Sequence, residues 1–216
     1  MRGRIRSIQS IDWRIANRSC GYLSLAHRGQ GAGGAWSGPR HCAGLASTGR
    51  NFPRPFVSVR VTPAIRAVAA AAIRHRVLEY DYDPSAEAIG LQAAEALGID
   101  PARVFKTLVV ALDTGELVCV AIPSDARLSL KALAAAAGAK RAEMAQPAKA
   151  ERATGYVVGG ISPFGQRRRL RTFIDESALG HAEILLNGGR RGLQIGLAPD
   201  DAVAALGAAA LPLTAA

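Results

Sequence analysis

A glycine-rich segment, residues 155–166, is the part of the chain where the backbone can approach another group most closely. Four glycines and Pro163 interrupt apolar residues that would otherwise form a strand. Glycine permits positive φ and exposes its N–H group, so such a segment can bind a ligand through its backbone. The same composition also suits a tight corner between two strands. The residues alone leave both interpretations open.

The chain offers few nucleophilic side chains that could be paired with a base. Ser162 lies in the glycine segment, and Asp175 and His181 follow it along the chain. These three could form a Ser-His-Asp triad, although no nucleophile-elbow pattern surrounds the serine. We therefore expect catalysis without a protein nucleophile.

Lys106 stands at the head of the apolar segment 107–112. Its ammonium group either reaches solvent at the strand end or is held partly desolvated against a ligand. Tyr80, at the end of an expected strand, could bond a ligand or be an ordinary half-buried aromatic residue. Six arginines could follow phosphate groups or form a solvated face. They are Arg167, Arg168, Arg169, Arg171, Arg190 and Arg191.

These residues require a scaffold of alternating helices and short strands. Thr62 and Ser129 are expected N-caps, and the expected helices cover 62–74, 86–97, 129–137 and 147–152, with a last one from Pro199. Expected strands cover 77–80, 105–112, 117–122, 170–174, 183–186 and 193–197, the second and third as a hairpin. This irregular alternation predicts an α/β fold with a mixed sheet. The alanines at 208–210 are attributed to composition bias.

The net charge of +10 is concentrated in the first 60 residues. They hold ten arginines and one acid, Asp12, whereas residues 61–216 carry 17 basic and 16 acidic side chains. We expect residues 61–216 to form the domain and to contact nucleic acid through a local patch. Residues 1–60 are expected to be a disordered basic leader. A phosphate-binding arm, a transit peptide and a misassigned start before Val61 are the alternatives, and we favour the last.

The cysteines have no spacing typical of a disulfide framework or a zinc site. Cys20 and Cys42 lie in the leader, and Cys119 lies in the apolar segment 117–122, where a thiol is usually a small core residue. The chain has no apolar run of 18 residues and no secretory signal pattern. We therefore expect a cytoplasmic protein without a membrane partner.

Several separated motifs occur in the order typical of one family. They are Thr62-Pro63-Ala64, Tyr80 with Asp83-Pro84, Lys106-Thr107-Leu108, Gly138-Ala139-Lys140, Glu143-Met144-Ala145, the glycine segment and Arg191-Gly192-Leu193. From about Val61 to Asp201 the chain resembles the YbaK/EbsC family. These are free-standing Cys-tRNA(Pro) deacylases related to the editing insertion of prolyl-tRNA synthetases.

The resemblance implies a curved, mixed, barrel-like sheet flanked by helices, with Lys106 as the catalytic residue. Lys106 would bind the 3′-terminal nucleotide or the carbonyl of the substrate and stabilise developing negative charge. The implied substrate-binding residues are Tyr80, Gly159, Gly160, Ser162, Asn187, Gly188 and Gln194, and the implied tRNA contacts are Arg167, Arg168, Arg190 and Arg191. Asn187 and Gln194 replace the serine and aspartate common in the family, which puts the amino-acid specificity in question.

The implied function is trans-editing, the removal of cysteine from Cys-tRNA(Pro) and also from Cys-tRNA(Cys). The cysteinyl thiol would attack its own carbonyl and leave as a thiolactone, without metal or organic cofactor. The implied partners are the acceptor end of tRNA(Pro) and prolyl-tRNA synthetase, and not DNA. Two alternatives stay open: a water-dependent deacylase of Ala-tRNA(Pro) or another mischarged tRNA, and a non-catalytic module that binds tRNA ends or nucleotides.

Overall fold

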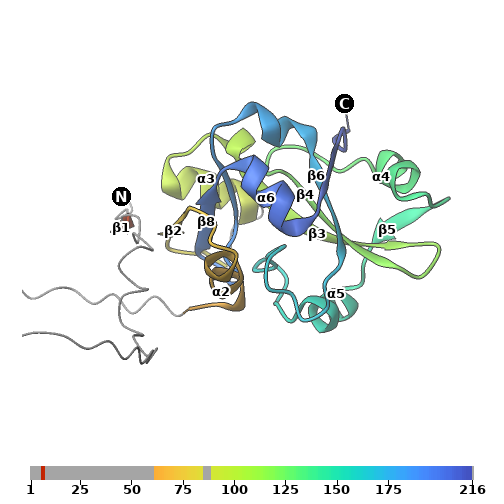
Figure 1. Ribbon diagram of the computed structural model, residues 1–216, viewed down its shortest axis with the longest axis horizontal. Helices are drawn as coiled ribbons and strands as arrows, with labels where there is room; N and C mark the ends of the chain where they lie inside the picture. Colours follow the sequence, from red (N-terminus) through yellow and green to blue (C-terminus); the bar gives the residue numbers. More distant parts are fainter. Residues whose placement is uncertain (1–5, 8–60, 85–88, 216) are drawn as a thin grey trace, which may run out of the picture. The chain divides into compact units, whose positions relative to one another are not determined.

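The computed structural model describes residues 6–7, 61–84 and 89–215. Its helices are α2 (Pro63–Ala70), α3 (Ile89–Leu97), α4 (Leu130–Ala137), α5 (Pro147–Thr154) and α6 (Pro199–Leu206), with 3-10 turns at Pro101–Arg103 and Glu176–Gly180 (Figure 1). Its strands are β1 (Arg6–Ser7), β2 (His75–Glu79), β3 (Val104–Leu112), β4 (Leu117–Pro123), β5 (Ala142–Met144), β6 (Arg171–Asp175), β7 (Ile184–Asn187), β8 (Leu193–Leu197) and β9 (Ala209–Leu211).

The described strands form one mixed sheet in the order β1-β2-β8-β7-β3-β4-β6-β9, with β5 also paired to β3. β3 and β4 form the expected antiparallel hairpin, and β7 and β8 form another. β3 runs parallel to β7, and β4 runs parallel to β6. The prediction of a mixed sheet flanked by helices is therefore confirmed.

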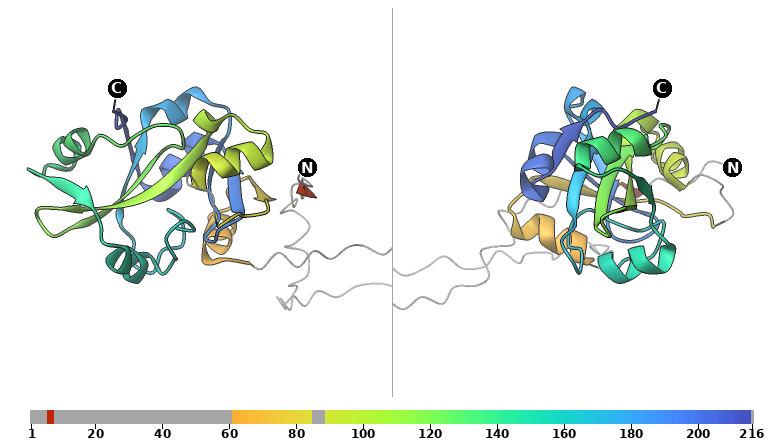
Figure 2. Two further views of the ribbon diagram at one scale, coloured as in Figure 1. Left: turned by 180° about the vertical axis from the view of Figure 1, so that it is seen from behind. Right: turned by 90° about the vertical axis from the view of Figure 1, so that its right-hand side faces the viewer.

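Alternate residues of β4 face two separate cores, as the two-residue period of a strand requires. In β4, Cys119 and Ala121 face the core that includes residues of α2, α5 and α6. Val118, Val120 and Ile122 face the opposite core, which includes α4. α4 and α5 accordingly lie on opposite sides of the β3–β4 hairpin (Figure 2). The sheet is buried on both faces.

The helix ends follow local sequence signals, with one exception. The hydroxyl groups of Thr62 and Ser129 accept hydrogen bonds from the N–H groups of Ile65 and Ala132, so both predicted caps are confirmed. The prediction that the first helix continues to residue 74 is wrong, because α2 ends at Ala70. The chain turns there through Ala72, whose φ is +54°, and then enters β2.

Besides β1, two short strands were not predicted. β9 contains alanines that were attributed to composition bias, yet it pairs in parallel with β6. β5 pairs with the end of β3. Both have only three residues, so their strand conformation comes from a distant partner and not from a local pattern.

One side of β3 has a gap in its pairing. The register with β7 covers Val104 and Phe105, and the register with β5 begins at Val110. Residues 106–108 have no paired residue on this side, although β4 pairs with them on the other, and the carbonyl oxygen of Val109 already accepts from the N–H group of Ala145. The sheet therefore opens beside Lys106.

The first 60 residues, with Cys20 and Cys42, lie outside the described residues except for β1. Arg6 and Ser7 pair with Glu79 and Leu78 of β2. That this segment is a separate leader stays a prediction. Among the described helices, none has the length and hydropathy needed to cross a bilayer.

Two glycines with the same φ of +63° allow a matched stability test. An added Cβ on Gly98 would meet nothing within 4 Å, whereas one on Gly165 would lie 2.6 Å from the carbonyl carbon of Pro63. We expect Gly98→Ala to lower the free energy of unfolding by about 1 kcal/mol, from backbone strain alone. Gly165→Ala should cost about 2–4 kcal/mol, because the glycine segment is also forced away from α2. Urea denaturation gives both values, and equal losses would contradict the close packing at Gly165.

Candidate active site

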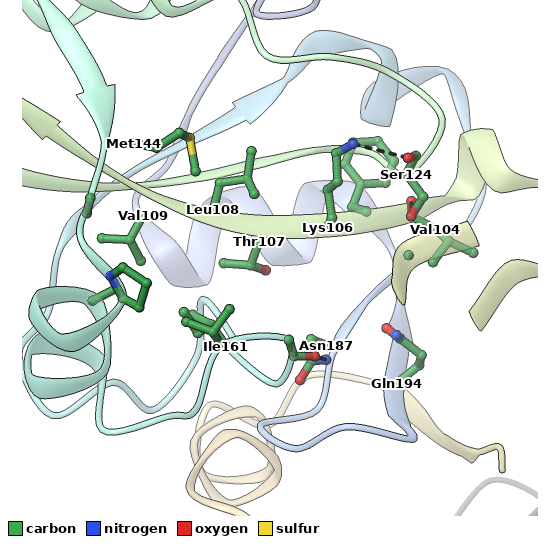
Figure 3. Close-up of a pocket in the computed structure, with 17 residues that line it drawn as sticks. Val104, Lys106, Thr107, Leu108, Val109, Ser124, Met144, Ile161, Asn187 and Gln194 are labelled. Atoms are coloured by element: carbon green, nitrogen blue, oxygen red, sulfur yellow. Dashed lines mark hydrogen bonds between the residues drawn. The ribbon is translucent and has the colours of Figure 1, made fainter. Parts of the chain in front are cut away.

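A cavity of about 540 Å³ opens at the gap in the sheet (Figure 3). Its aliphatic end and its polar end are distinct. Leu108, Val109, Met144 and Ile161 lie toward the aliphatic end, and Lys106, Ser124, Asn187 and Gln194 lie toward the other end, where Val104 is also found. Such a cavity can hold a small side chain at one end and a polar group at the other.

Lys106 lies half-buried at the polar end of the cavity. Its Nζ atom donates to the carbonyl oxygens of Ala126, at 2.6 Å, and Ser124, at 3.1 Å. An ammonium group has three donors, so one remains for a ligand. Burial lowers the pKa of Lys106; the carboxylate of Asp125 opposes this shift and the charge of Arg127 adds to it. Lys106 is thus the partly desolvated lysine of the two alternatives.

Two buried oxygens in the cavity lining have no hydrogen-bond partner. They are Oγ1 of Thr107 and Oε1 of Gln194. Buried polar atoms are rarely left unpaired, so these oxygens are candidate acceptors for a ligand. Gln194 is a predicted site residue. Thr107 is an addition, and its place next to Lys106 in an interrupted edge of β3 is the signal that could have found it.

Tyr80 lies beside the cavity and does not line it. Its buried hydroxyl group has no hydrogen-bond partner. Burial raises the pKa of Tyr80, while the backbone of Gly192 and the side chain of Gln194 lower it. Tyr80 is therefore next to Gln194, and its contact with a ligand stays a prediction.

The glycine segment forms one wall of the cavity, through Val158, Gly159 and Ile161. Gly160 does not line the cavity, and its backbone contacts the turn between β7 and β8. An added Cβ on Gly160 would lie 2.9 Å from the Cα atom of Arg190. Glycine is therefore required at 160 for the contact of two backbones. An added Cβ on Gly188, in the same turn, would lie 2.7 Å from Cγ of buried Leu193.

Two side chains of the β7–β8 turn hold this wall in place. Asn187 donates from Nδ2 to the carbonyl oxygen of Gly159 at 3.2 Å and accepts from the N–H group of Gly189 at 2.8 Å. Arg191 donates from Nε and Nη2 to the carbonyl oxygen of Val158, at 3.1 and 2.8 Å. Arg190 pairs with Glu79. Asn187, Arg190 and Arg191 thus have structural partners within the domain.

Arg167 and Arg168 are exposed, and their backbones dock on the end of α5. Their N–H groups donate to the carbonyl oxygens of Thr154, at 2.9 Å, and Ala153, at 3.0 Å. α5 also carries the exposed Arg152. These three arginines therefore gather at the C-terminal end of a helix that lines the cavity.

The hydrogen bonds of the described residues do not join Ser162, His181 and Asp175 into a triad. Ser162 is fully buried and its Oγ accepts from the N–H group of Phe164. The carboxylate of Asp175 accepts from Ser177 and from the N–H group of Leu213. The buried thiol of Cys119 belongs to the core, as predicted, and burial raises its pKa to about 12.

The cavity, with its lysine, its wall of backbone and its unpaired oxygens, has the composition of a site for a small polar ligand. A family comparison gives the particular class. Residues 83–205 match the aminoacyl-tRNA editing domain. The chain belongs to this family, which confirms the resemblance seen in its motifs.

One similar protein comes from Enterococcus faecalis and is named "Putative Cys-tRNA(Pro)/Cys-tRNA(Cys) deacylase EbsC". It is 40% identical over 141 residues, which cover 64% of this chain and 84% of that protein. The residues matched by the family, 83–205, include Lys106 and the glycine segment.

Two solved structures share the fold. One is described as a putative trans-editing enzyme for prolyl tRNA synthetase, with a TM-score of 0.64 at 24% identity over 71% of this chain and 96% of that one. The other is hypothetical protein APE2540, with a TM-score of 0.65 at 25% identity over 71% of this chain and all of that one.

The contact of Asn187 with Gly159 predicts a local effect of one substitution. Asn187→Asp removes the donor to Gly159 and keeps the acceptor for Gly189. We expect amide hydrogen exchange at residues 157–161 to become about fivefold faster, since a single net hydrogen bond is lost. The amides of the β3–β4 hairpin are the internal control and should not change. Unchanged exchange in the glycine segment would show that Asn187 does not hold it.

Proposed function

We propose that this protein deacylates mischarged tRNA, with Cys-tRNA(Pro) and also Cys-tRNA(Cys) as substrates. The observation that carries the proposal is Lys106, a partly desolvated lysine that lines a cavity in which the described residues form no triad. Membership of the editing-domain family and the name of the Enterococcus relative support the same substrates. We expect a cytoplasmic location, because charged tRNA is used there, and prolyl-tRNA synthetase as a partner.

The reaction would use the substrate's own thiol. The aminoacyl ester binds with its carbonyl oxygen on the free N–H of Lys106 and its side chain toward the aliphatic end. The thiol sulfur bonds to the carbonyl carbon, the bond from that carbon to the ribose oxygen breaks, and the thiol proton ends on the ribose oxygen. The products are a cyclic thiolactone and tRNA with a free hydroxyl. Holding thiol and carbonyl close can lower the barrier by roughly 7–11 kcal/mol.

Of the four predicted tRNA contacts, we retain Arg167 and Arg168 as phosphate-binding residues and add Arg152. All three are exposed at the end of α5, which lines the cavity. Arg190 and Arg191 already bond Glu79 and Val158. Their positive charge contributes less to phosphate binding, because each guanidinium is held against the domain.

Lys106→Ala should abolish most activity while the domain stays folded. We expect kcat/KM for Cys-tRNA(Pro) to fall by about 100-fold or more, since the donor to the carbonyl oxygen is lost. Lys106→Arg should also lose most activity, because a planar guanidinium cannot replace a compact ammonium. Lys131→Ala removes an exposed lysine and is the matched control. Activity of Lys106→Ala within about threefold of the wild type would exclude the proposed role.

The identity of the first product tests the use of the thiol. We expect thiolactone, or its trapped derivative, as the first product from Cys-tRNA(Pro), and much slower cleavage of Ser-tRNA(Pro), whose hydroxyl is a weaker nucleophile. Cys119→Ala should leave the rate intact, because its thiol is buried in the core. Free cysteine as the first product, with Ser- and Ala-tRNA(Pro) cleaved equally well, would indicate attack by water. Uncleaved tRNA that still binds would indicate a binding module.

Charges beside Lys106 should shift the alkaline limit of activity in opposite directions. Asp125 raises the pKa of Lys106 and Arg127 lowers it. Asp125→Asn should therefore lower the pH at which activity is lost by deprotonation of Lys106, and Arg127→Gln should raise it. Rates corrected for spontaneous ester hydrolysis give both profiles. If the alkaline limit of activity shifted in the same direction in both variants, a group other than Lys106 would set that limit.

A further inference from the structure

Arg191 and Tyr82 form a flat, fixed surface at the rim of the cavity that the reaction does not use. The guanidinium carbon of Arg191 lies 5.4 Å from the centre of the Tyr82 ring. Two hydrogen bonds to the carbonyl oxygen of Val158 fix the guanidinium plane. Val158 itself lines the cavity and is 39% exposed. This surface is therefore next to the cavity mouth.

The fixed guanidinium group is open to a ligand. Arg191 is exposed, and the ion pairs found among the described residues do not include it. One face of its plane lies toward Tyr82, whose Cβ atom lies 3.6 Å from where a Cβ on Gly192 would be. Guanidinium planes and aromatic rings are the two groups on which proteins stack unpaired bases.

The surrounding charges favour a base over a phosphate group. Asp81 precedes Tyr82 in the sequence and is exposed. Its carboxylate repels a phosphate group but not a neutral nucleobase. The neighbouring Val157, which is 56% exposed, adds apolar surface.

We propose that Tyr82 and Arg191 form a stacking surface for the unpaired nucleobase next to the aminoacylated terminal nucleotide. The proposal rests on the proposed function, since that function places the terminal nucleotide in the cavity. The next base along the strand then lies at the rim formed by Val158, where this surface is. It would increase the affinity for single-stranded RNA ends. An aminoacyl nucleoside has no neighbouring base and would not gain this affinity.

Two substrates separate this role from a structural one. The first is a cysteinylated RNA hairpin with a single-stranded CCA end, and the second is cysteinyl-adenosine, which has no neighbouring base. Tyr82→Leu should raise KM for the hairpin by about 5- to 30-fold, the usual effect of one lost stacking contact, and leave cysteinyl-adenosine cleavage within about twofold. Tyr82→Phe keeps the ring and should behave as the wild type on both substrates.

An abasic site at the penultimate nucleotide tests the same contact from the RNA side, with the wild-type enzyme. It should raise KM as much as Tyr82→Leu does, and the two changes together should give no further loss. The proposal would be overturned if Tyr82→Leu impaired cleavage of both substrates equally or did not impair cleavage of the hairpin. It would also be overturned if the effects of Tyr82→Leu and of the abasic site on KM were independent and added. If the wild type cleaves neither substrate, the proposed function fails. Binding of the uncharged hairpin with and without its penultimate base, measured by fluorescence anisotropy, then tests the surface alone.

Discussion

Direct contact between two backbones, at Gly160 and at Arg190, sets the shape of the cavity. No side chain fits between them, so the glycine segment and the β7–β8 turn are held at a fixed separation. Asn187 and Arg191 then bond to the carbonyl groups of Gly159 and Val158, the two residues before that contact. The wall of the cavity has no regular secondary structure, and its order comes from these neighbours. A segment that is irregular in conformation can therefore still be rigid.

The chemistry of the cavity depends on an interruption in the sheet. β3 leaves β7 after Phe105 and meets β5 at Val110, which opens one strand edge beside Lys106. A continuous sheet would pair the backbone groups of this edge and leave no opening for a cavity beside Thr107. Lys106, at the same opening, is partly removed from water without being fully buried. The fold thus produces a cavity by ending one pairing early.

Features that depend on neighbouring residues could be predicted from the sequence. The cap at Ser129, the helix end at Gly98 and the β3–β4 hairpin are of this kind, since each follows from a few adjacent residues. The importance of Lys106 came from the family resemblance, because a lysine at a strand head is otherwise ambiguous. The internal partner of Arg191 could not be predicted from the sequence. It is a backbone carbonyl oxygen 33 residues away, and every residue type carries such a group.

The ends of the domain close on each other, which has a consequence for the order of folding. β2 pairs with β8, and the hydroxyl of Thr62 donates to the carbonyl oxygen of Gly188, 126 residues further along the chain. Contacts of such high sequence separation form slowly and late. A nascent chain carries Lys106 long before it carries β8, so the lysine emerges from the ribosome without its cavity. The chain therefore becomes active only once the strands that complete the cavity have been synthesised. Truncated translation products would not attack the charged tRNAs that surround them.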